Sequence, residues 1–167
     1  MILQRLKVFL DSHKVKYVVI THSQAYTALE IAALARIPGK EVAKSVIVKI
    51  DDKMMMIVVP ASHMVDFNAL QTFTGAQHIE LASEQQFKDK FPECEVGAMP
   101  PFGNLFEMDV VVSSSLEEDE MIAFNAGTHK ELVKMSYREF AQLVQPKVGK
   151  LSFPKRYSFA REMWDIP

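Results

Sequence analysis

Two β-rich runs joined by only three residues constrain the fold more than any other feature of this sequence. The runs are 44–50 and 54–60, and Asp51, Asp52 and Lys53 link them. Parallel strands need a crossover of about a dozen residues or more, so a link this short predicts an antiparallel hairpin. A purely parallel, doubly wound sheet is therefore not expected.

The rest of the chain alternates helical and extended patterns. Apolar residues recur at helical spacing from Ile2 to Leu10, and 17–20 predicts a short buried strand. Thr27 and Glu30 form a capping-box pattern that begins a second helix. Further helices are predicted over 66–73, 83–90 and 137–144, and further strands over 79–81, 108–113, 121–124 and 132–135. Together these elements predict a mixed α/β (α+β) fold, with helices around a curved, barrel-like sheet.

A chain of 167 residues with 49% hydrophobic and 24% charged residues has the size and composition of one globular domain. Its net charge of -2 argues against a broad basic surface that coats nucleic acid. The segment 146–167 has a local balance of +3, so any RNA contact is expected to be local. Beyond Gln145-Pro146 the pattern is irregular, and its aromatic residues are expected to pack on the domain or on a partner: Phe153, Tyr157, Phe159 and Trp164.

The first eight residues lack the long apolar core and small-residue cleavage site of a secretory signal. The longest apolar run, 54–61, is far shorter than the ~18 residues of a membrane span. The lone Cys94 is typical of a reducing compartment, and its neighbours Glu93 and Glu95 raise a thiol pKa and so disfavour a cysteine nucleophile. We expect a cytoplasmic protein that binds neither membrane nor DNA.

Lys44 begins the first β-rich run. Strand alternation places its side chain on one face with Val46, Val48 and Ile50, while Lys49 points the other way. A lone cation at the end of an apolar face has a lowered pKa or binds an anion. On the residues alone, a side chain that reaches from the strand end to water is the favoured interpretation.

A second unusual segment is Gly97-Ala98-Met99-Pro100-Pro101-Phe102-Gly103, in which two glycines bracket a diproline. Glycine lets a backbone approach a ligand closely, proline stiffens the loop, and Phe102 is available as a wall. The residues alone support a ligand-binding loop and a structural turn equally.

The third segment is Phe124-Asn125-Ala126-Gly127-Thr128-His129, which lies between two predicted strands. A hydroxyl and an imidazole after a glycine can bind a ribose or a carboxyl group. On position alone, the favoured interpretation of His129 is a solvated turn residue.

In this order and spacing, Ala43-Lys44-Ser45-Val46-Ile47-Val48-Lys49, the 97–103 loop and Asn125-Ala126-Gly127-Thr128-His129 resemble the YbaK/ProX family of aminoacyl-tRNA deacylases. That family includes the editing domain inserted in bacterial prolyl-tRNA synthetases. The resemblance covers 1–148 and leaves 149–167 as a C-terminal tail. It implies a YbaK-like fold and hydrolysis of a mischarged amino acid from the tRNA 3′ end. Aminoacyl-tRNA is then the partner, and no metal or other cofactor is required.

The resemblance also implies residue roles. Lys44 holds the terminal phosphate or ribose and helps to position water, and Ser45 stands where many members have threonine. The backbone of the glycine-proline loop lines the aminoacyl pocket, and His129 matches a histidine that contacts the terminal ribose in some members. The predicted catalytic residues are Lys44 and Gly97, and the predicted substrate-binding residues are Tyr26, Thr27, Ser45, Pro100, Pro101, Phe102, Gly103, Gly127, Thr128 and His129.

No Gly-x-Ser-x-Gly elbow, His-Glu-x-x-His pair or cysteine cluster occurs in the sequence. An aminoacyl ester is already activated, so a placed water and a donor to the oxyanion suffice. Two other functions stay open: a module that binds an aminoacyl-tRNA end or a synthetase without hydrolysis, and a small-molecule esterase. For residues 147–161, contact with acceptor-stem phosphates and packing for stability or dimerisation are both retained.

Overall fold

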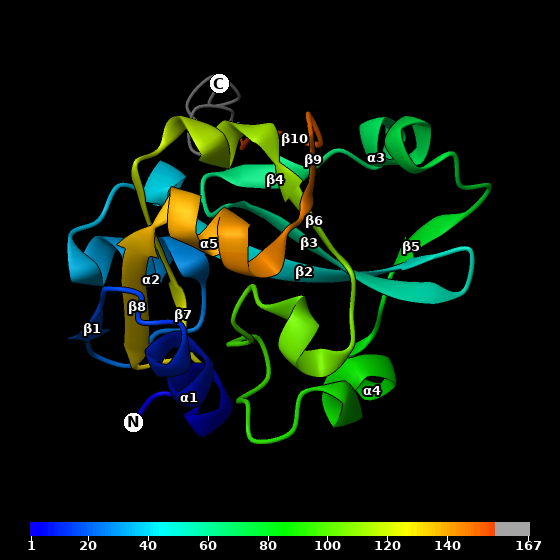
Figure 1. Ribbon diagram of the computed structural model, residues 1–167. Helices are drawn as coiled ribbons and strands as arrows, with labels where there is room; N and C mark the ends of the chain where they lie inside the picture. The colour runs from blue at the N-terminus through cyan, green and yellow to red at the C-terminus, as the bar shows by residue number, and fades with distance from the viewer. Residues whose placement is uncertain (156–167) are drawn as a thin grey trace, which may run out of the picture.

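The structure is a computed structural model that describes residues 1–155 of the chain (Figure 1). An eight-stranded mixed sheet and a separate two-stranded sheet form its β-structure. The strands are β1 (Tyr17–Thr21), β2 (Val42–Ile50), β3 (Lys53–Pro60), β4 (His63–Val65), β5 (Ile79–Leu81), β6 (Val110–Ser113), β7 (Met121–Asn125), β8 (Glu131–Ser136), β9 (Lys147–Gly149) and β10 (Ser152–Pro154). The α-helices are α1 (Gln4–Ser12), α2 (Ala28–Ala35), α3 (Phe67–Thr74), α4 (Glu84–Phe87) and α5 (Tyr137–Val144), and short 3-10 helices lie at Gly39–Glu41, Lys88–Lys90, Gly103–Phe106 and Ser114–Glu118.

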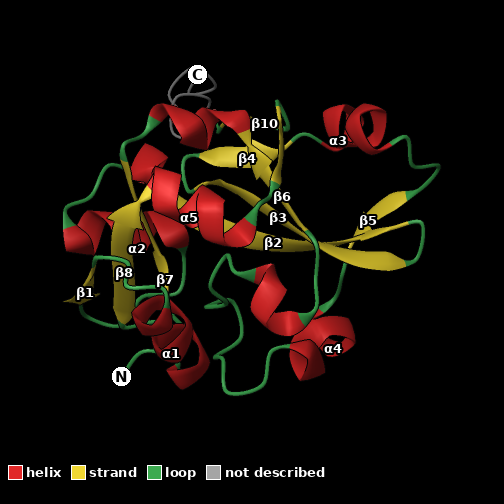
Figure 2. Cartoon of the chain, viewed as in Figure 1, coloured by secondary structure: helices red, strands yellow, loops and turns green. Residues whose placement is uncertain are grey.

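The large sheet is mixed, as predicted. Its strand order is β1-β8-β7-β2-β3-β6-β9, and β5 pairs with β2 beside this path. The pairs β7–β2, β3–β6 and β6–β9 are parallel, and the other pairs in the sheet are antiparallel. Helices pack around this sheet, which confirms the predicted fold class (Figure 2).

The hairpin of β2 and β3 forms where the short link predicts it. Its antiparallel register is continuous from Ala43 to Ile50 on β2. Asp51 and Asp52 turn the chain with φ angles of 46° and 68°. Two left-handed residues give the tight turn whose twist matches that of the strands, and aspartate tolerates this region better than most residues.

One edge of β2 carries two different strands, and the space between them positions the candidate site. β7 pairs with β2 at Val42 and Ala43, and β5 pairs with it at residues 48–50. β3 occupies the opposite edge from residue 43 to residue 50, so β5 and β7 share one edge. The Ile47 carbonyl still accepts from the Ala82 N–H, so residues 44–46 face a break in the sheet, and Lys44 is the first of them.

Four α-helices begin at a side chain that accepts a hydrogen bond from the first turn. These N-caps are Thr27 of α2, Asp66 of α3, Ser83 of α4 and Ser136 of α5. Each cap satisfies an N–H group that has no partner inside its helix, and all four helix starts were predicted. Within residues 1–155, none of the helices is long and apolar enough to cross a membrane.

The two largest apolar clusters of the described residues lie on opposite sides of the sheet. One core packs α1, α4 and α5 around a cluster of phenylalanines that includes Phe102 and Phe124. The other packs α3 and Leu151 against Val48 and Ile57. Figure 1 shows α3 and α4 on opposite sides of the β2–β3 hairpin. Alternation along β2 thus puts Lys44 on the side of the second core.

Two sequence predictions are corrected by the structure. The strand β1 is not buried, because it lies at the edge of the sheet, with Val18 60% exposed. Residues 147–155 are not irregular, because β9 pairs with β6 and β10 pairs with β4. The boundary predicted after residue 148 falls inside β9 and precedes Leu151, which is fully buried. Phe153 is half exposed, and the predicted packing of the other aromatics, at 157, 159 and 164, lies outside the described residues.

Candidate active site

The glycine loop and the third motif lie side by side. The Glu95 N–H donates to the Gly127 carbonyl at 2.8 Å, and the Gly127 N–H donates to the Ala98 carbonyl at 2.9 Å. Gly97 and Gly127 have φ angles of 84° and 99°. These left-handed values favour glycine, so the two glycines allow the segments to run together.

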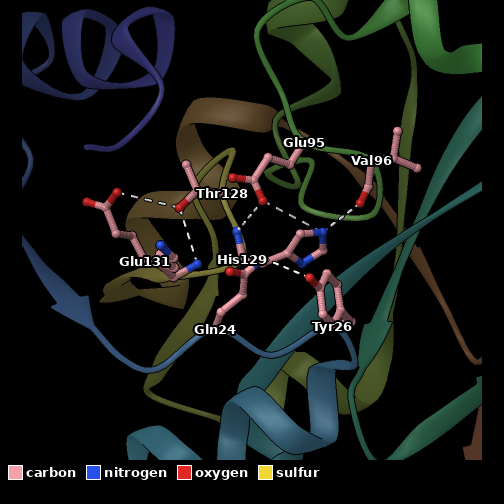
Figure 3. A network of polar contacts seen from close by, with 8 residues as sticks. Gln24, Tyr26, Glu95, Val96, Thr128, His129 and Glu131 are labelled. Carbon is pink, nitrogen blue, oxygen red and sulfur yellow. Dashed lines mark hydrogen bonds and ion pairs between the residues drawn. The ribbon is translucent and has the colours of Figure 1, made fainter.

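His129 fastens the glycine loop to the third motif (Figure 3). Its ring Nε2 lies 2.7 Å from the Val96 carbonyl. A carbonyl can only accept, so Nε2 carries the proton and donates. The backbone N–H of His129 donates to Glu95 Oε2 at 3.1 Å. In the neutral ring Nδ1 is then an acceptor, and it is buried without a partner among residues 1–155.

Tyr26 packs against the His129 ring. The ring centroids are 5.1 Å apart and the planes are tilted by 54°. The tyrosine is nevertheless 68% exposed, and the Gln24 side-chain amide donates to its hydroxyl at 2.9 Å. Thr27 instead accepts from the Glu30 N–H at 3.1 Å as the cap of α2. Tyr26 is therefore open to solvent beside His129 and its contact with a substrate stays a prediction, whereas the hydroxyl of Thr27 caps a helix.

Gly127 and Thr128 shape the turn that carries His129. A Cβ added to Gly127 would lie 3.0 Å from the Leu3 Cβ, which leaves little room for a side chain. Thr128 Oγ1 accepts from the Lys130 N–H at 3.3 Å, within the same turn. Both residues thus have a structural task, and their contact with a substrate stays a prediction.

Lys44 lies in a separate pocket of about 260 Å³. The pocket is otherwise lined by Val46, Met64, Val65, Phe67, Leu81 and Lys155. In the part of the chain that the structure describes, the Lys44 ammonium forms no ion pair with a carboxylate. Burial, followed by the neighbouring Lys155 ammonium, lowers the pKa of Lys44 to about 8. The predicted cation on an apolar face is thus confirmed, although Lys155 accompanies it.

The break in the sheet relates the Lys44 pocket to the third motif. The last registered pair between β2 and β7 joins Ala43 to Phe124, so Lys44 and Asn125 come next on adjacent strands. The Asn125 Oδ1 is buried without a partner within residues 1–155, and so is the Ser45 Oγ. Most buried polar atoms have a hydrogen-bond partner, so unpaired ones mark a place for water or a ligand.

The second half of the glycine-proline loop belongs to the core. Phe102 is 0% exposed, and its ring centroid lies 5.4 Å from that of Phe124. Residues 100 and 101 are buried as well. A Cβ added to Gly103 would lie 2.5 Å from the Met108 carbonyl oxygen, so close packing requires this glycine. The prediction that Phe102 forms a wall of the substrate pocket is therefore wrong.

Three residues of the site are absent from the predicted set. Glu95 and Asn125 lie within or next to recognised motifs, and their neighbours could have indicated them. Lys155 belongs to the basic segment 147–161, for which contact with tRNA phosphates was one expectation, but only the three-dimensional fold places it beside Lys44.

A family model described as aminoacyl-tRNA editing domain matches residues 22–143, which is more than half of the chain. Proline–tRNA ligase of Bacillus cereus strain AH187 is 28% identical over 87 residues, which cover 52% of this chain and 15% of the ligase. Proline–tRNA ligase of Bacillus mycoides strain KBAB4 matches to the same extent. The chain therefore spans only a small part of these curated relatives.

Solved structures share the fold. One, described as a hypothetical protein, is 19% identical with a TM-score of 0.80, over 90% of this chain and 100% of that chain. Another, described as a candidate trans-editing enzyme for prolyl tRNA synthetase, is 18% identical with a TM-score of 0.76, over 90% of this chain and 96% of that chain. At these identities the likeness concerns the fold alone. Lys44, Gly97 and His129 fall inside the family match, and β9, β10 and Lys155 lie beyond it.

Proposed function

The chain belongs to the aminoacyl-tRNA editing domain family, and on this premise we propose that it hydrolyses the ester between a mischarged amino acid and the 3′ end of a tRNA. The observation that carries the proposal is the position of Lys44. It is a half-buried cation without a carboxylate partner among residues 1–155, at a break in the sheet that the third motif borders. A tRNA end offers phosphate, ribose hydroxyls and the ester to such groups.

In this proposal Lys44 binds the terminal phosphate. An ammonium that is partly removed from water gains more from an anion than an exposed one, because the local dielectric is lower. The apolar neighbours of Lys44 in the pocket supply that environment. The phosphate therefore fixes the terminal nucleotide, and the ester is placed at the break in the sheet.

The glycine loop supplies the group that stabilises the developing oxyanion. Gly97 is exposed, and its N–H has no acceptor within residues 1–155. A water molecule adds to the ester carbonyl, the bond to the ribose oxygen breaks, and that oxygen takes a proton with help from the neighbouring ribose hydroxyl. One well-aimed donor to the oxyanion contributes about 3 kcal/mol of transition-state stabilisation.

His129 is a positioning residue in this mechanism. Its Nε2–H bond to Val96 holds the loop next to Gly97. Its Nδ1 is buried without a partner among residues 1–155, so a direct hydrogen bond from a ribose hydroxyl is not part of this mechanism. Burial raises the pKa of Cys94 to about 11, so a cysteine thiolate does not compete as the nucleophile at neutral pH.

The test is a deacylation screen with the purified chain. Correctly charged and mischarged tRNAs are incubated with the protein, with alanine, serine, proline and cysteine in the panel, and free amino acid is measured against a protein-free control. Release from at least one mischarged tRNA supports the proposal. Binding of charged tRNA without release at high protein concentration would instead identify a non-catalytic module. Equal turnover of a simple aminoacyl ester without tRNA would identify a small-molecule esterase.

A further inference from the structure

A lysine from outside the family match shares the pocket of Lys44. Lys155 directly follows β10 and lines the same pocket, whereas the family model ends at residue 143. Like Lys44, it forms no ion pair with a carboxylate among the described residues 1–155. Among the described residues, the lining of the pocket thus holds two cations and apolar side chains and includes no carboxylate.

The backbone of Lys155 is anchored beside this pocket. Its N–H donates to the Ser62 carbonyl at 2.8 Å, and β10 pairs with β4 over three residues. Ser152 lies at the start of β10. Its Oγ is 2.6 Å from the Ser113 Oγ and 2.8 Å from the His63 Nδ1. These bonds hold the segment against the domain, so Lys155 reaches the pocket from a fixed position.

Two ammonium groups at one place repel each other, and an anion between them removes that repulsion. Burial is the first cause of the lowered pKa of Lys44, about 8, and the neighbouring Lys155 ammonium is the second. Burial and the Lys44 ammonium also lower the pKa of His63, against an opposing effect of Glu118. The lowered pKa favours the neutral form of the His63 ring, and the cations among the residues that line the pocket are Lys44 and Lys155.

We propose that Lys44 and Lys155 bind a single phosphate group of the tRNA 3′ end between them, so that the segment after the family domain completes the substrate site. This inference rests on the proposed function. The pocket supports it, because its volume of about 260 Å³ is sufficient for one phosphate group beside the two lysines.

The first test is kinetic and uses the full chain with a mischarged tRNA that it deacylates. Lys155→Gln should raise the KM about tenfold with little change in kcat, because a charge-assisted contact to the ground-state phosphate is lost. The slope of log(kcat/KM) against log[salt] is negative, and it should become shallower by about 0.7 to 0.9, the value for one phosphate contact. Lys155→Arg should recover most of the loss. Lys150→Gln removes an exposed lysine of the same segment, and a loss equal to that of Lys155→Gln would overturn the proposal.

The second test needs no catalysis and so separates this inference from the proposed function. The pH titration of the Lys44 side chain is followed by carbon NMR at its Cε, with and without inorganic phosphate. Phosphate should raise the pKa of Lys44, and Lys155→Gln should raise it without phosphate and weaken the response to phosphate. A chain that passes this test but deacylates no tRNA would reject the proposed function only. A Lys44 titration that neither phosphate nor Lys155→Gln moves would reject the two-lysine site.

Discussion

The imidazole Nε2 of His129 lies 2.7 Å from the carbonyl oxygen of Val96. The bond joins two motifs that are far apart in the sequence and sets the position of the next residue, Gly97. Backbone bonds between Gly127 and the loop run beside it. The loop that we propose to face the ester is therefore held by the third motif and not by its own stiffness alone.

Removal of the His129 side chain should slow deacylation. We expect His129→Ala to lower kcat about tenfold to a hundredfold, because a misplaced loop no longer aims its donor at the ester. His129→Gln should retain more activity, since its side-chain amide can still donate to Val96. The comparison is made by steady-state kinetics, with His78→Ala as the control because His78 is exposed and lies outside the site. Equal losses in the Ala and Gln variants would contradict a role through the Val96 bond.

Gly97→Ala should impair catalysis through backbone strain. At a φ of 84° an alanine costs about 1–2 kcal/mol, whereas its Cβ would lie at an ordinary 3.5 Å from His129 Cε1. Gly75→Ala is the matched control, because Gly75 has a φ of 70° with open space around it and ends α3. Urea unfolding should show similar losses of stability in both variants, and deacylation should fall only in Gly97→Ala. Normal deacylation by Gly97→Ala would remove this glycine from the mechanism.

The pH dependence of kcat/KM should report the Lys44 ammonium. The pKa of Lys44 is lowered to about 8, so the charged form that binds phosphate is lost above that pH. We expect kcat/KM, after subtraction of the alkaline hydrolysis of the ester, to be flat near neutrality and to decline above about pH 8. In Lys155→Gln the decline should begin at higher pH. A profile that rises through this range would indicate that the neutral amine is the active form.

The same lowered pKa affects stability. Lys44 keeps the usual pKa of 10.5 when the chain is unfolded and about 8 when it is folded. Between these values the unfolded state binds more protons, so the contribution of Lys44 to the free energy of unfolding rises with pH. Its unfavourable effect is fully present below about pH 8 and is relieved above it. The difference between wild type and Lys44→Met, measured by urea unfolding at pH 7 and pH 9.5, should shrink at the higher pH; a constant difference would contradict the shift.

Phe102 should matter for stability and not for substrate contact. Phe102→Ala removes a fully buried ring and should cost about 3–5 kcal/mol in the free energy of unfolding. Phe102→Leu should cost less and leave kcat/KM per folded molecule close to that of wild type. If Phe102→Leu is stable but has a strongly raised KM, Phe102 contacts the substrate after all.

A truncation that tests the role of the C-terminal segment has to keep the strand pairs formed after residue 148. A chain that ends at Val148 loses Leu151, which is fully buried in the second core, together with the pair of β10 and β4. We expect a loss of about 2–5 kcal/mol for Leu151→Ala alone. Loss of tRNA binding after that truncation would therefore not establish a contact by residues 147–161. Truncation after Lys155 keeps these elements, and an unchanged salt dependence in that variant would argue against contact by residues 156–161.

Local patterns predicted most elements of this fold. The hairpin follows from a short link between two β-rich runs, and the helix starts follow from N-cap residues such as Thr27 and Ser136. The short link and the N-cap hydrogen bonds each involve residues only a few positions apart, so the local sequence is enough to predict them. The family resemblance likewise rested on three short motifs, and the family match contains all of them.

What the sequence did not predict depends on contacts between distant segments. Val18 lies on an exposed edge because β1 pairs on one side only. Phe102 belongs to the core because aromatic rings from other elements surround it. Lys155 reaches Lys44 because β10 pairs with β4, and neither of these short strands has a strong pattern of its own. Side-chain exposure and site membership therefore required the three-dimensional arrangement.

The central claim is tested most directly by the deacylation rate of Lys44→Ala on a mischarged tRNA. The matched control is Lys49→Ala, because Lys49 lies on the same strand, points to the opposite face and pairs with Glu80 at 3.9 Å. With both variants folded by circular dichroism, Lys44→Ala should lose about a hundredfold in kcat/KM, because without its phosphate anchor the ester is misplaced relative to the glycine loop, while Lys49→Ala stays near wild type. A Lys44→Ala variant that releases the amino acid at the wild-type rate would contradict the account.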